Sequence, residues 1–442
     1  MKMNNHRFSC LQRGRMLVVL ALCQCSVLSS LSQTVMELIR EKPAYASCNY
    51  NTYPDSIPDN LTPSPAGKRP FYLSHYGRHG SRYISDRSGY DIPYRMMNHA
   101  DSVDELTPVG KRVLQEIQIV MDDTENRWGE LTGYGREQHR RIARHMVERF
   151  PEVFCSGATV QAKSTTVPRC IESMGTAVAE LLQVQPGLQV TMEASKRTMN
   201  YMNYQDKKLR KGYMTPEASK AFVAYAVSRM GNSRLMEQIF KNPDIVKEIV
   251  EEDYFNYYLM KMGLFQLNTH LFQNTYLMDL FRIEELYRLW QIDNALWYIK
   301  HGACKLNGGK QPSSQRYLLR QLIADADSCL QLESLGAQLR FGHETVLLPL
   351  VCLIGINGYD LATDNLDELE DKGWRCSDVF PMGSNVQFVF YRESPMDQDV
   401  LVKVLLNEQE ATLPIETDCA PYYHWNDFRR FCMEKLSAYS LN

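Results

Sequence analysis

A histidine framed by two arginines follows a short run of apolar and aromatic residues. In "FYLSHYGRHGSRY", residues 71–83, His79 stands between Arg78 and Arg82. Guanidinium groups bind phosphate oxygens in bidentate pairs, and their charge favours the unprotonated, nucleophilic form of a nearby imidazole. This loop could therefore bind a phosphate dianion and accept a phosphoryl group on His79. The alternative is that Arg78 and Arg82 are ordinary surface charges.

Two later stretches supply the other groups that phosphoryl transfer requires. The leaving oxygen needs an acid, and the third phosphate oxygen needs a further positive charge. Arg169 in "STTVPRCIESM" and His343 in "RFGHET" could complete the anion site, and Glu344 could donate the proton. The alternatives are that Arg169 and Glu344 merely begin helices and that His343 is a core histidine.

All of these residues fall where a predicted strand ends. Residues 69–77, 157–165 and 336–344 each predict a strand and a loop, and residues 167–183 and 345–356 predict helices after the second and third. This recurrence predicts an α/β fold, with a Rossmann-like, mostly parallel sheet flanked by helices. Ligands of such sheets bind beyond the carboxyl ends of the strands, which is where the candidate residues lie.

The middle of the chain has a different pattern. Residues 195–305 carry apolar side chains every three or four positions and few strand signals, so we expect an inserted helical cap domain. Residues 33–194 and 306–442 would then form the α/β core. Within the cap, "KKLRKG" at 207–212 could clamp a polyphosphate, and the alternative is a solvated basic loop.

The first 32 residues have the pattern of a signal peptide. Basic residues precede the apolar run "MLVVLALCQCSVLSSL", and small residues lie at cleavage spacing before Gln33. We therefore expect export to the periplasm or the extracellular space. Lipid anchoring at Cys23 or Cys25 is disfavoured, because Leu22 and Gln24 stand where a small residue would be needed. No later segment is apolar and long enough to predict a membrane span.

Charge and cysteine spacing exclude other classes. Removing the leader removes four basic residues and no acidic one, so the formal net charge changes from −3 to −7. With no basic stripe, a nucleic-acid partner is not expected. The spacing of the remaining cysteines matches no zinc motif, predicts no metal and leaves any disulfide pairing open: Cys48, Cys155, Cys170, Cys304, Cys329, Cys352, Cys376, Cys419 and Cys432.

Three other histidines have structural interpretations. His75 is close in sequence to His79, but a packed strand histidine is favoured over a metal ligand. His139 and His145 in "GREQHRRIARHMVERF" are expected on the exposed face of a helix.

The three motifs, in this order, resemble those of the histidine acid phosphatases. "RHGSR" at 78–82 is similar to the RHGxR signature of that family, "STTVPRCIESM" to the stretch with its third phosphate-binding arginine, and "RFGHET" to its second histidine and proton donor. "LRFGHETVLLPLVCLIG" and "PMGSNVQFVFYR" are most similar to multiple inositol polyphosphate phosphatases, which dephosphorylate phytate. That subgroup carries His-Ala-Glu and the wider family His-Asp, whereas here Glu344 follows His343 directly.

The resemblance implies an exported phosphomonoesterase that hydrolyses phytate-like esters through a phosphohistidine. His79 would be the nucleophile and Glu344 the acid, with no cofactor, because arginines supply the positive charge. The alternatives are a general acid phosphatase or sugar-phosphate phosphatase of the same fold, and a non-catalytic anion-binding protein. A carboxylate beside a bound phosphate repels it, so Glu344 favours the enzyme.

Overall fold

The computed structural model describes residues 33–204, 206–230, 234–244, 252–271, 277–330 and 336–439. The predicted signal peptide, residues 1–32, lies outside the described residues. None of the described helices has the length and hydrophobicity needed to cross a lipid bilayer.

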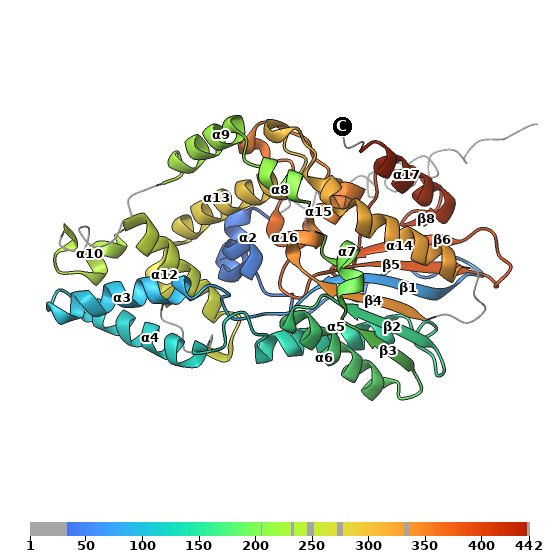
Figure 1. Ribbon diagram of the computed structural model, residues 1–442, viewed down its shortest axis with the longest axis horizontal. Helices are drawn as coiled ribbons and strands as arrows, with labels where there is room; N and C mark the ends of the chain where they lie inside the picture. The colour runs from blue at the N-terminus through green and yellow to red at the C-terminus, as the bar shows by residue number, and fades with distance from the viewer. Residues whose placement is uncertain are drawn as a thin grey trace, which may run out of the picture.

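Within the described ranges, a central sheet of eight strands organises the fold (Figure 1). The order is β3-β2-β4-β1-β5-β6-β7, with β8 on β6. Strands β3, β2, β4 and β1 are parallel, whereas β5 is antiparallel to both β1 and β6. The predicted mostly parallel α/β sheet is confirmed. The strands are β1 (Arg69–Arg78), β2 (Thr159–Ser164), β3 (Gln189–Glu193), β4 (Ala337–Gly342), β5 (Asn385–Arg392), β6 (Leu401–Leu406), β7 (Gln409–Glu410) and β8 (Tyr422–His424).

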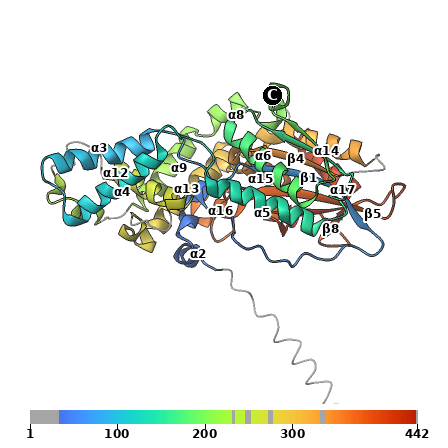
Figure 2. The same cartoon turned by 90° about the horizontal axis from the view of Figure 1, so that it is seen from below.

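Helices cover both faces of this sheet, because the inner strands alternate apolar side chains between two cores. Leu73 and Leu339 pack on the face of α5 (Gly133–Arg149) and α6 (Pro168–Val184). Tyr72, Tyr76 and Phe388 point to the opposite face. That face is covered by α14 (Arg316–Cys329), α15 (Glu344–Ile354) and α17 (Trp425–Ser437), as Figures 1 and 2 show.

Helices of the predicted cap lie at the end of the molecule away from the sheet (Figures 1 and 2). They include α10 (Leu235–Ile239) and α12 (Glu252–Gln266), with α9 (Pro216–Val227) and α13 (Ile283–His301) nearer the core. Two earlier helices, α3 (Ser88–Ser102) and α4 (Pro108–Thr124), pack against α12 and α10. The shorter elements are α2 (Val35–Glu41), η1 (Pro43–Tyr50), η2 (Lys196–Thr198), α7 (Met199–Met202), α8 (Lys207–Gly212), η4 (Leu277–Leu280), η5 (Lys305–Asn307), η6 (Gln311–Gln315), η7 (Ile356–Gly358), η8 (Leu366–Glu368) and α16 (Cys376–Val379).

The histidine predictions have different outcomes. His75 is buried in β1 with its ring 5.4 Å from that of Phe341, as expected for a packed strand histidine. The prediction for His139 is wrong, because it lies on the buried side of α5 and also packs against Phe341. His145 is partly buried and bonds Glu408. Arginines flank both histidines in the sequence, but the helix turns the histidines toward the sheet.

A buried ion pair ties α14 to the sheet. Arg340 of β4 contacts Asp325 at 2.5 Å and donates to the Ser74 hydroxyl at 3.0 Å. Arg340 is fully buried and the Asp325 side chain is 15% exposed. Removing one partner of such a pair leaves a poorly solvated charge.

We therefore expect Arg340→Met to lower the free energy of unfolding by about 3 kcal/mol, because Asp325 loses its counter-charge. Urea denaturation followed by circular dichroism measures this loss. Arg320→Met, on the exposed side of α14, is the control and should change stability by less than about 0.5 kcal/mol. Equal effects of the two substitutions would contradict the assignment.

Candidate active site

Two neighbouring parallel strands bring the histidines of the first and third motifs together. Arg78 at the end of β1 is paired in register with Gly342 at the end of β4. The backbone amide of His79 donates to the Gly342 carbonyl at 3.0 Å. The rings of His79 and His343 therefore lie edge to face, with centroids 5.7 Å apart.

Gly80 allows the start of α5 to reach this loop. A Cβ atom on Gly80 would lie 2.4 Å from the carbonyl oxygen of Gly135, and one on Gly135 would lie 2.2 Å from that of Ser81. The Ser81 amide donates to the Gln138 side chain at 2.8 Å. The loop after β1 is thus fixed against the first turns of α5, and this close contact explains the glycine after His79.

Arg78 is buried, and backbone carbonyls hold most of its guanidinium group. Nη1 donates to the Phe380 carbonyl at 2.6 Å and Nη2 to the Asn49 carbonyl at 2.7 Å. The remaining nitrogen, Nε, lies 3.2 Å from the Glu344 carboxylate. Because Nη1 and Nη2 are held by carbonyls, the orientation of Arg78 is fixed by η1 and by the segment after α16.

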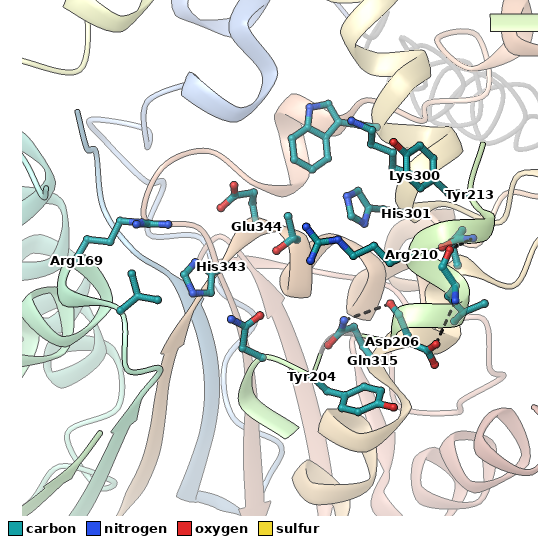
Figure 3. Close-up of a pocket in the computed structure, with 17 residues that line it drawn as sticks. Arg169, Tyr204, Asp206, Arg210, Tyr213, Lys300, His301, Gln315, His343 and Glu344 are labelled. Atoms are coloured by element: carbon teal, nitrogen blue, oxygen red, sulfur yellow. Dashed lines mark hydrogen bonds between the residues drawn. The ribbon is translucent and has the colours of Figure 1, made fainter. Parts of the chain in front are cut away.

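Arg82 and Arg169 add two further positive charges to the same site. Arg82 donates from Nη1 to the Tyr50 hydroxyl at 2.9 Å, and its guanidinium lies 5.1 Å from the centre of that ring. Arg169 occupies the first turn of α6 and points toward His343 (Figure 3). Burial, followed by the charge of Arg82, lowers the pKa of Arg169. A site that brings together the positive charges of three arginines is suited to bind an anion.

The contacts of His79 define its tautomer. Nδ1 lies 2.8 Å from the Gly80 carbonyl oxygen, which can only accept, so Nδ1 carries the proton. Nε2 then presents its lone pair to the site. Burial and the charge of Arg78 hold the pKa of His79 well below its ordinary value, so the imidazole is neutral at mildly acid pH.

Glu344, the first residue of α15, lies against both Arg78 and His79. Its Oε2 atom is 3.2 Å from Arg78 Nε and 3.6 Å from His79 Nε2. Burial alone would raise the pKa of this carboxyl, but the charges of Arg78 and Arg82 outweigh burial and hold the pKa well below its usual range. In this state the side chain is a carboxylate.

His343 is held by the end of β2 and the start of α6. Its Nε2 atom is 3.2 Å from the Thr165 hydroxyl and 3.7 Å from the sulfur of Cys170. Burial and Arg169 lower the pKa of His343 to about 4. Burial also raises the pKa of Cys170 to about 12, so this cysteine is a neutral thiol.

A cavity of about 620 Å³ opens beside Arg169, His343 and Glu344. Arg169, His343 and Glu344 lie on one side, and residues of α8 and α13 lie on the other (Figure 3). The lining residues are Val167, Arg169, Asn203, Tyr204, Asp206, Leu209, Arg210, Tyr213, Trp297, Lys300, His301, Gln311, Ser314, Gln315, His343, Glu344 and Thr345.

Arg210 extends from α8 into this cavity, with its guanidinium group toward Glu344 (Figure 3). The Asp206 side chain caps α8 by accepting from Lys208 and Leu209 amides, and it pairs with Arg316 at 2.8 Å. "KKLRKG" is therefore a short anchored helix rather than a loop. Of its four basic residues, Arg210 lines the cavity.

Lys300 and His301 lie outside the three sequence motifs and line the same side of the cavity at the end of α13. Burial lowers the pKa of Lys300, and it lowers that of His301 to about 3, with Lys300 adding to the effect. Basic residues in the last turn of a helix are ordinary, so their sequence gave no signal. Only the fold brings them opposite Arg169, His343 and Glu344.

The same side chains fit a metal ion poorly. Ligand atoms of His79, His343 and Glu344 lie within 4.8 Å of one another. However, the positive charges of Arg78, Arg82 and Arg169 surround them and would repel a cation. The charge of the site therefore favours an anionic ligand.

The chain is similar to known inositol polyphosphate phosphatases and phytases. Over 333 residues, which are 69% of this chain and 67% of the relative, the chain is 23% identical to multiple inositol polyphosphate phosphatase 1 from Homo sapiens. The structure is similar to that of the Bifidobacterium longum multiple inositol polyphosphate phosphatase in complex with inositol hexasulfate, with a TM-score of 0.71. The two chains are 18% identical, and the match covers 87% of this chain and 97% of that one.

A phytase from D. castellii also shares the fold, with a TM-score of 0.62 and 14% identity over 93% of this chain and 89% of the phytase. The profile of the histidine phosphatase superfamily (branch 2) matches residues 77–407, which contain all three motifs. Because that match covers most of the chain, the protein belongs to the histidine phosphatase superfamily, branch 2.

Proposed function

We propose that the protein hydrolyses inositol polyphosphates such as phytate, one phosphate at a time, through a phosphohistidine on His79. The observation that carries this proposal is the Nε2 atom of His79, which is buried, unprotonated and surrounded by arginines. Arg78, Arg82 and Arg169 would bind the three oxygens that do not react. The names of the relatives support the choice of inositol phosphates.

The first step forms the phosphoenzyme. Nε2 of His79 attacks phosphorus, the bond from phosphorus to the ester oxygen breaks, and Glu344 gives its proton to that oxygen. In the second step, water attacks the phosphohistidine, the bond from phosphorus to nitrogen breaks, and Glu344 takes the proton from water. Inorganic phosphate leaves, and His79 and the protonated acid are restored.

Substrate binding would itself convert Glu344 into an acid. The carboxylate now lies against Arg78 Nε and His79 Nε2, which is the position that the phosphoryl group must occupy. A bound phosphate would displace it from Arg78 and place a negative charge beside it. Both changes raise the pKa of a carboxyl group, so a proton would be held until the leaving oxygen takes it.

The opposite side of the cavity supports a polyphosphate over a simple monoester. A cavity of about 620 Å³ is large enough for a ligand much bigger than one phosphate group. Arg210 and Lys300 line it on the side opposite Arg169, His343 and Glu344, where they could bind phosphates that are not being cleaved. A sugar monophosphate bound at His79 would present no second phosphate group to Arg210 and Lys300.

We further propose that the helices of residues 195–305 act as the cap domain and that the protein is exported. Arg210, Lys300 and His301 all come from this segment, which supports a role for it in substrate binding. Export rests on the pattern of residues 1–32, which includes basic residues and a long apolar run.

His79→Ala should reduce turnover of phytate by about 10³-fold or more, because the variant lacks the Nε2 atom that would form the covalent intermediate. Rapid mixing with ³²P-labelled substrate, followed by an alkaline quench, should label the wild-type protein and not the variant. The exposed His99→Ala variant should retain both turnover and label. A labelled His79→Ala protein would disprove the assignment of the nucleophile.

Glu344→Gln should slow the release of phosphate from phytate by about 10²- to 10⁴-fold, because an alkoxide leaves poorly without a proton. Phosphoryl transfer from 4-nitrophenyl phosphate should be barely slowed, because its phenolate leaves without a proton. Burst kinetics with both substrates separate this step from hydrolysis of the phosphoenzyme. If Glu344 were only structural, both substrates would lose the same factor.

The value of kcat/KM for an alkyl phosphate should fall about tenfold per pH unit above roughly pH 6. The pKa of Glu344 in the free site is well below its usual range, so the required proton arrives with the phosphate monoanion, whose pKa is about 6. The pKa of His79 is also lowered, so kcat/KM should stay level from about pH 6 down to pH 5. A loss between pH 7 and pH 6 as the pH falls would mean an ordinary histidine.

Arg210→Ala should raise KM for phytate about tenfold and leave 4-nitrophenyl phosphate unaffected, because only the polyphosphate reaches α8. Steady-state kinetics with both substrates test this. Lys211→Ala is the matched control, since Lys211 lies on the same helix, is exposed and does not line the cavity. Equal loss on both substrates would place Arg210 in the chemistry instead.

A further inference from the structure

A second cluster of ligand-type side chains lies at the start of α17. Asp418, Cys419 and His424 each offer one ligand atom, and these three atoms lie within 4.8 Å of one another. His424 Nε2 is 3.0 Å from Asp418 Oδ1 and 4.0 Å from Cys419 Sγ. The cluster combines an imidazole, a thiol and a carboxylate, and the proposed phosphatase reaction uses none of them.

The imidazole is oriented from behind by a fourth residue. Nδ1 of His424 lies 2.7 Å from Asp399 Oδ1, so Nδ1 carries a proton and Nε2 faces the other two ligand atoms. Asp399 is fixed in turn, because its amide donates to Asp397 at 2.9 Å and its carboxylate lies 3.2 Å from Lys68. A carboxylate behind the ligating histidine is the usual outer shell of a protein zinc site.

The cysteine is held by a closed turn. The Thr417 hydroxyl lies 3.3 Å from Cys419 Sγ and donates to the Tyr422 carbonyl at 2.8 Å. The Tyr422 amide returns a hydrogen bond to the Cys419 carbonyl at 2.9 Å. His424 is the last residue of β8, the strand that follows this turn and pairs with β6. The two strongest ligands are therefore placed by backbone hydrogen bonds.

The spacing of the atoms is close to that around tetrahedral zinc. Bond lengths of about 2.0–2.1 Å to nitrogen and oxygen and 2.3 Å to sulfur put the nitrogen about 3.3 Å from the oxygen and 3.6 Å from the sulfur. The observed distances are 3.0 Å and 4.0 Å. Shifts of about 0.4 Å would satisfy the geometry.

We propose that Asp418, Cys419 and His424 bind a zinc-class divalent cation, with water as the fourth ligand and Asp399 as the outer-shell partner of His424. The Asp418 side chain is 83% exposed, so the fourth position faces solvent. On binding, the thiol proton and any proton on His424 Nε2 pass to solvent. The mixture of sulfur, nitrogen and oxygen ligands selects zinc or cobalt over magnesium or calcium.

This site is separate from the phosphatase centre. His424 is paired with Leu401, Leu401 with Tyr391, and Tyr391 with Pro70 at the start of β1. Arg78 lies at the other end of that strand, about 25 Å away. The cation would therefore tie the turn that contains Asp418 and Cys419 to the end of β8, and it would take no part in catalysis.

The competing arrangement contains no metal. A protonated His424 can donate to Asp399 and Asp418 at once, which accounts for the two short distances without a cation. In that case the Cys419 thiol only takes part in the hydrogen bonds of the turn, with the Thr417 hydroxyl and the Tyr422 carbonyl. The two arrangements therefore differ in whether the sulfur binds the added ion.

Co²⁺ shows directly whether the Cys419 sulfur binds the ion, because a cobalt–thiolate bond gives a near-ultraviolet charge-transfer band. Titration of the whole metal-free protein with Co²⁺ should produce this band and saturate at one ion per chain, and Zn²⁺ should remove it. Cys419→Ser should abolish the band, whereas Cys155→Ser, which changes an exposed cysteine outside the cluster, should retain it. Asp399→Asn should weaken Co²⁺ binding by about 10- to 100-fold.

Stability and activity complete the test. Zn²⁺ should raise the Tm of the wild-type protein by about 2–4 °C and leave that of Cys419→Ser unchanged. Hydrolysis of 4-nitrophenyl phosphate should be the same with and without a chelator, and in Cys419→Ser. Absence of a saturable band, or a band that survives in Cys419→Ser, would overturn the metal site. Loss of phosphatase activity on chelation would overturn its separation from catalysis.

Discussion

The buried guanidinium group of Arg78 is the constraint on which the site depends. Removing such a charge from water costs several kcal/mol unless partners replace the solvent. Two carbonyls do so here, from Asn49 in η1 and Phe380 after α16, and Glu344 supplies the opposite charge. Segments from both ends of the chain must therefore come together before the end of β1 can hold its arginine.

The contacts of Arg78 also couple the protonation states of His79, the proposed nucleophile, and Glu344, the proposed acid. Burial and the charge of Arg78 lower the pKa of His79 and keep it neutral, and the charge of Arg78 also keeps Glu344 ionised in the free site. A phosphate dianion would take over part of the charge that Glu344 now neutralises. The same arginine would thus first prepare the nucleophile and then, by binding substrate, release the acid from its ion pair.

The local patterns predicted the parts of the fold that carry the three motifs. Apolar runs bounded by glycine or proline placed β1, β4 and α6 to within a few residues. Their parallel pairing followed from the recurrence of strand, loop and helix. This was enough to place Arg169 and His343 at one edge of the sheet with His79, because carboxyl ends of parallel strands meet there.

The features of the site and fold that the sequence did not predict all depend on contacts between residues far apart in the chain. Nothing near Asn49 or Tyr50 in the chain marks them as partners of Arg78 and Arg82, because they act through a backbone carbonyl and a phenol. The packing of α3 and α4 on α12 and α10 joins segments that are each ordinary amphipathic helices. His139 shows the same limit, since only tertiary packing decides which side of a helix meets the sheet.

The basic side of the cavity extends this argument to specificity. Arg210 lies on a helix of only six residues, which would not be stable alone. Asp206 fixes its first turn and binds Arg316 of α14, and Gln311 donates to the Leu209 carbonyl at 3.2 Å. Since α14 packs on the sheet, the position of Arg210 relative to the phosphate-binding arginines is set by the core. A ligand that reaches both sides must therefore have its phosphate groups at a separation that the fold determines.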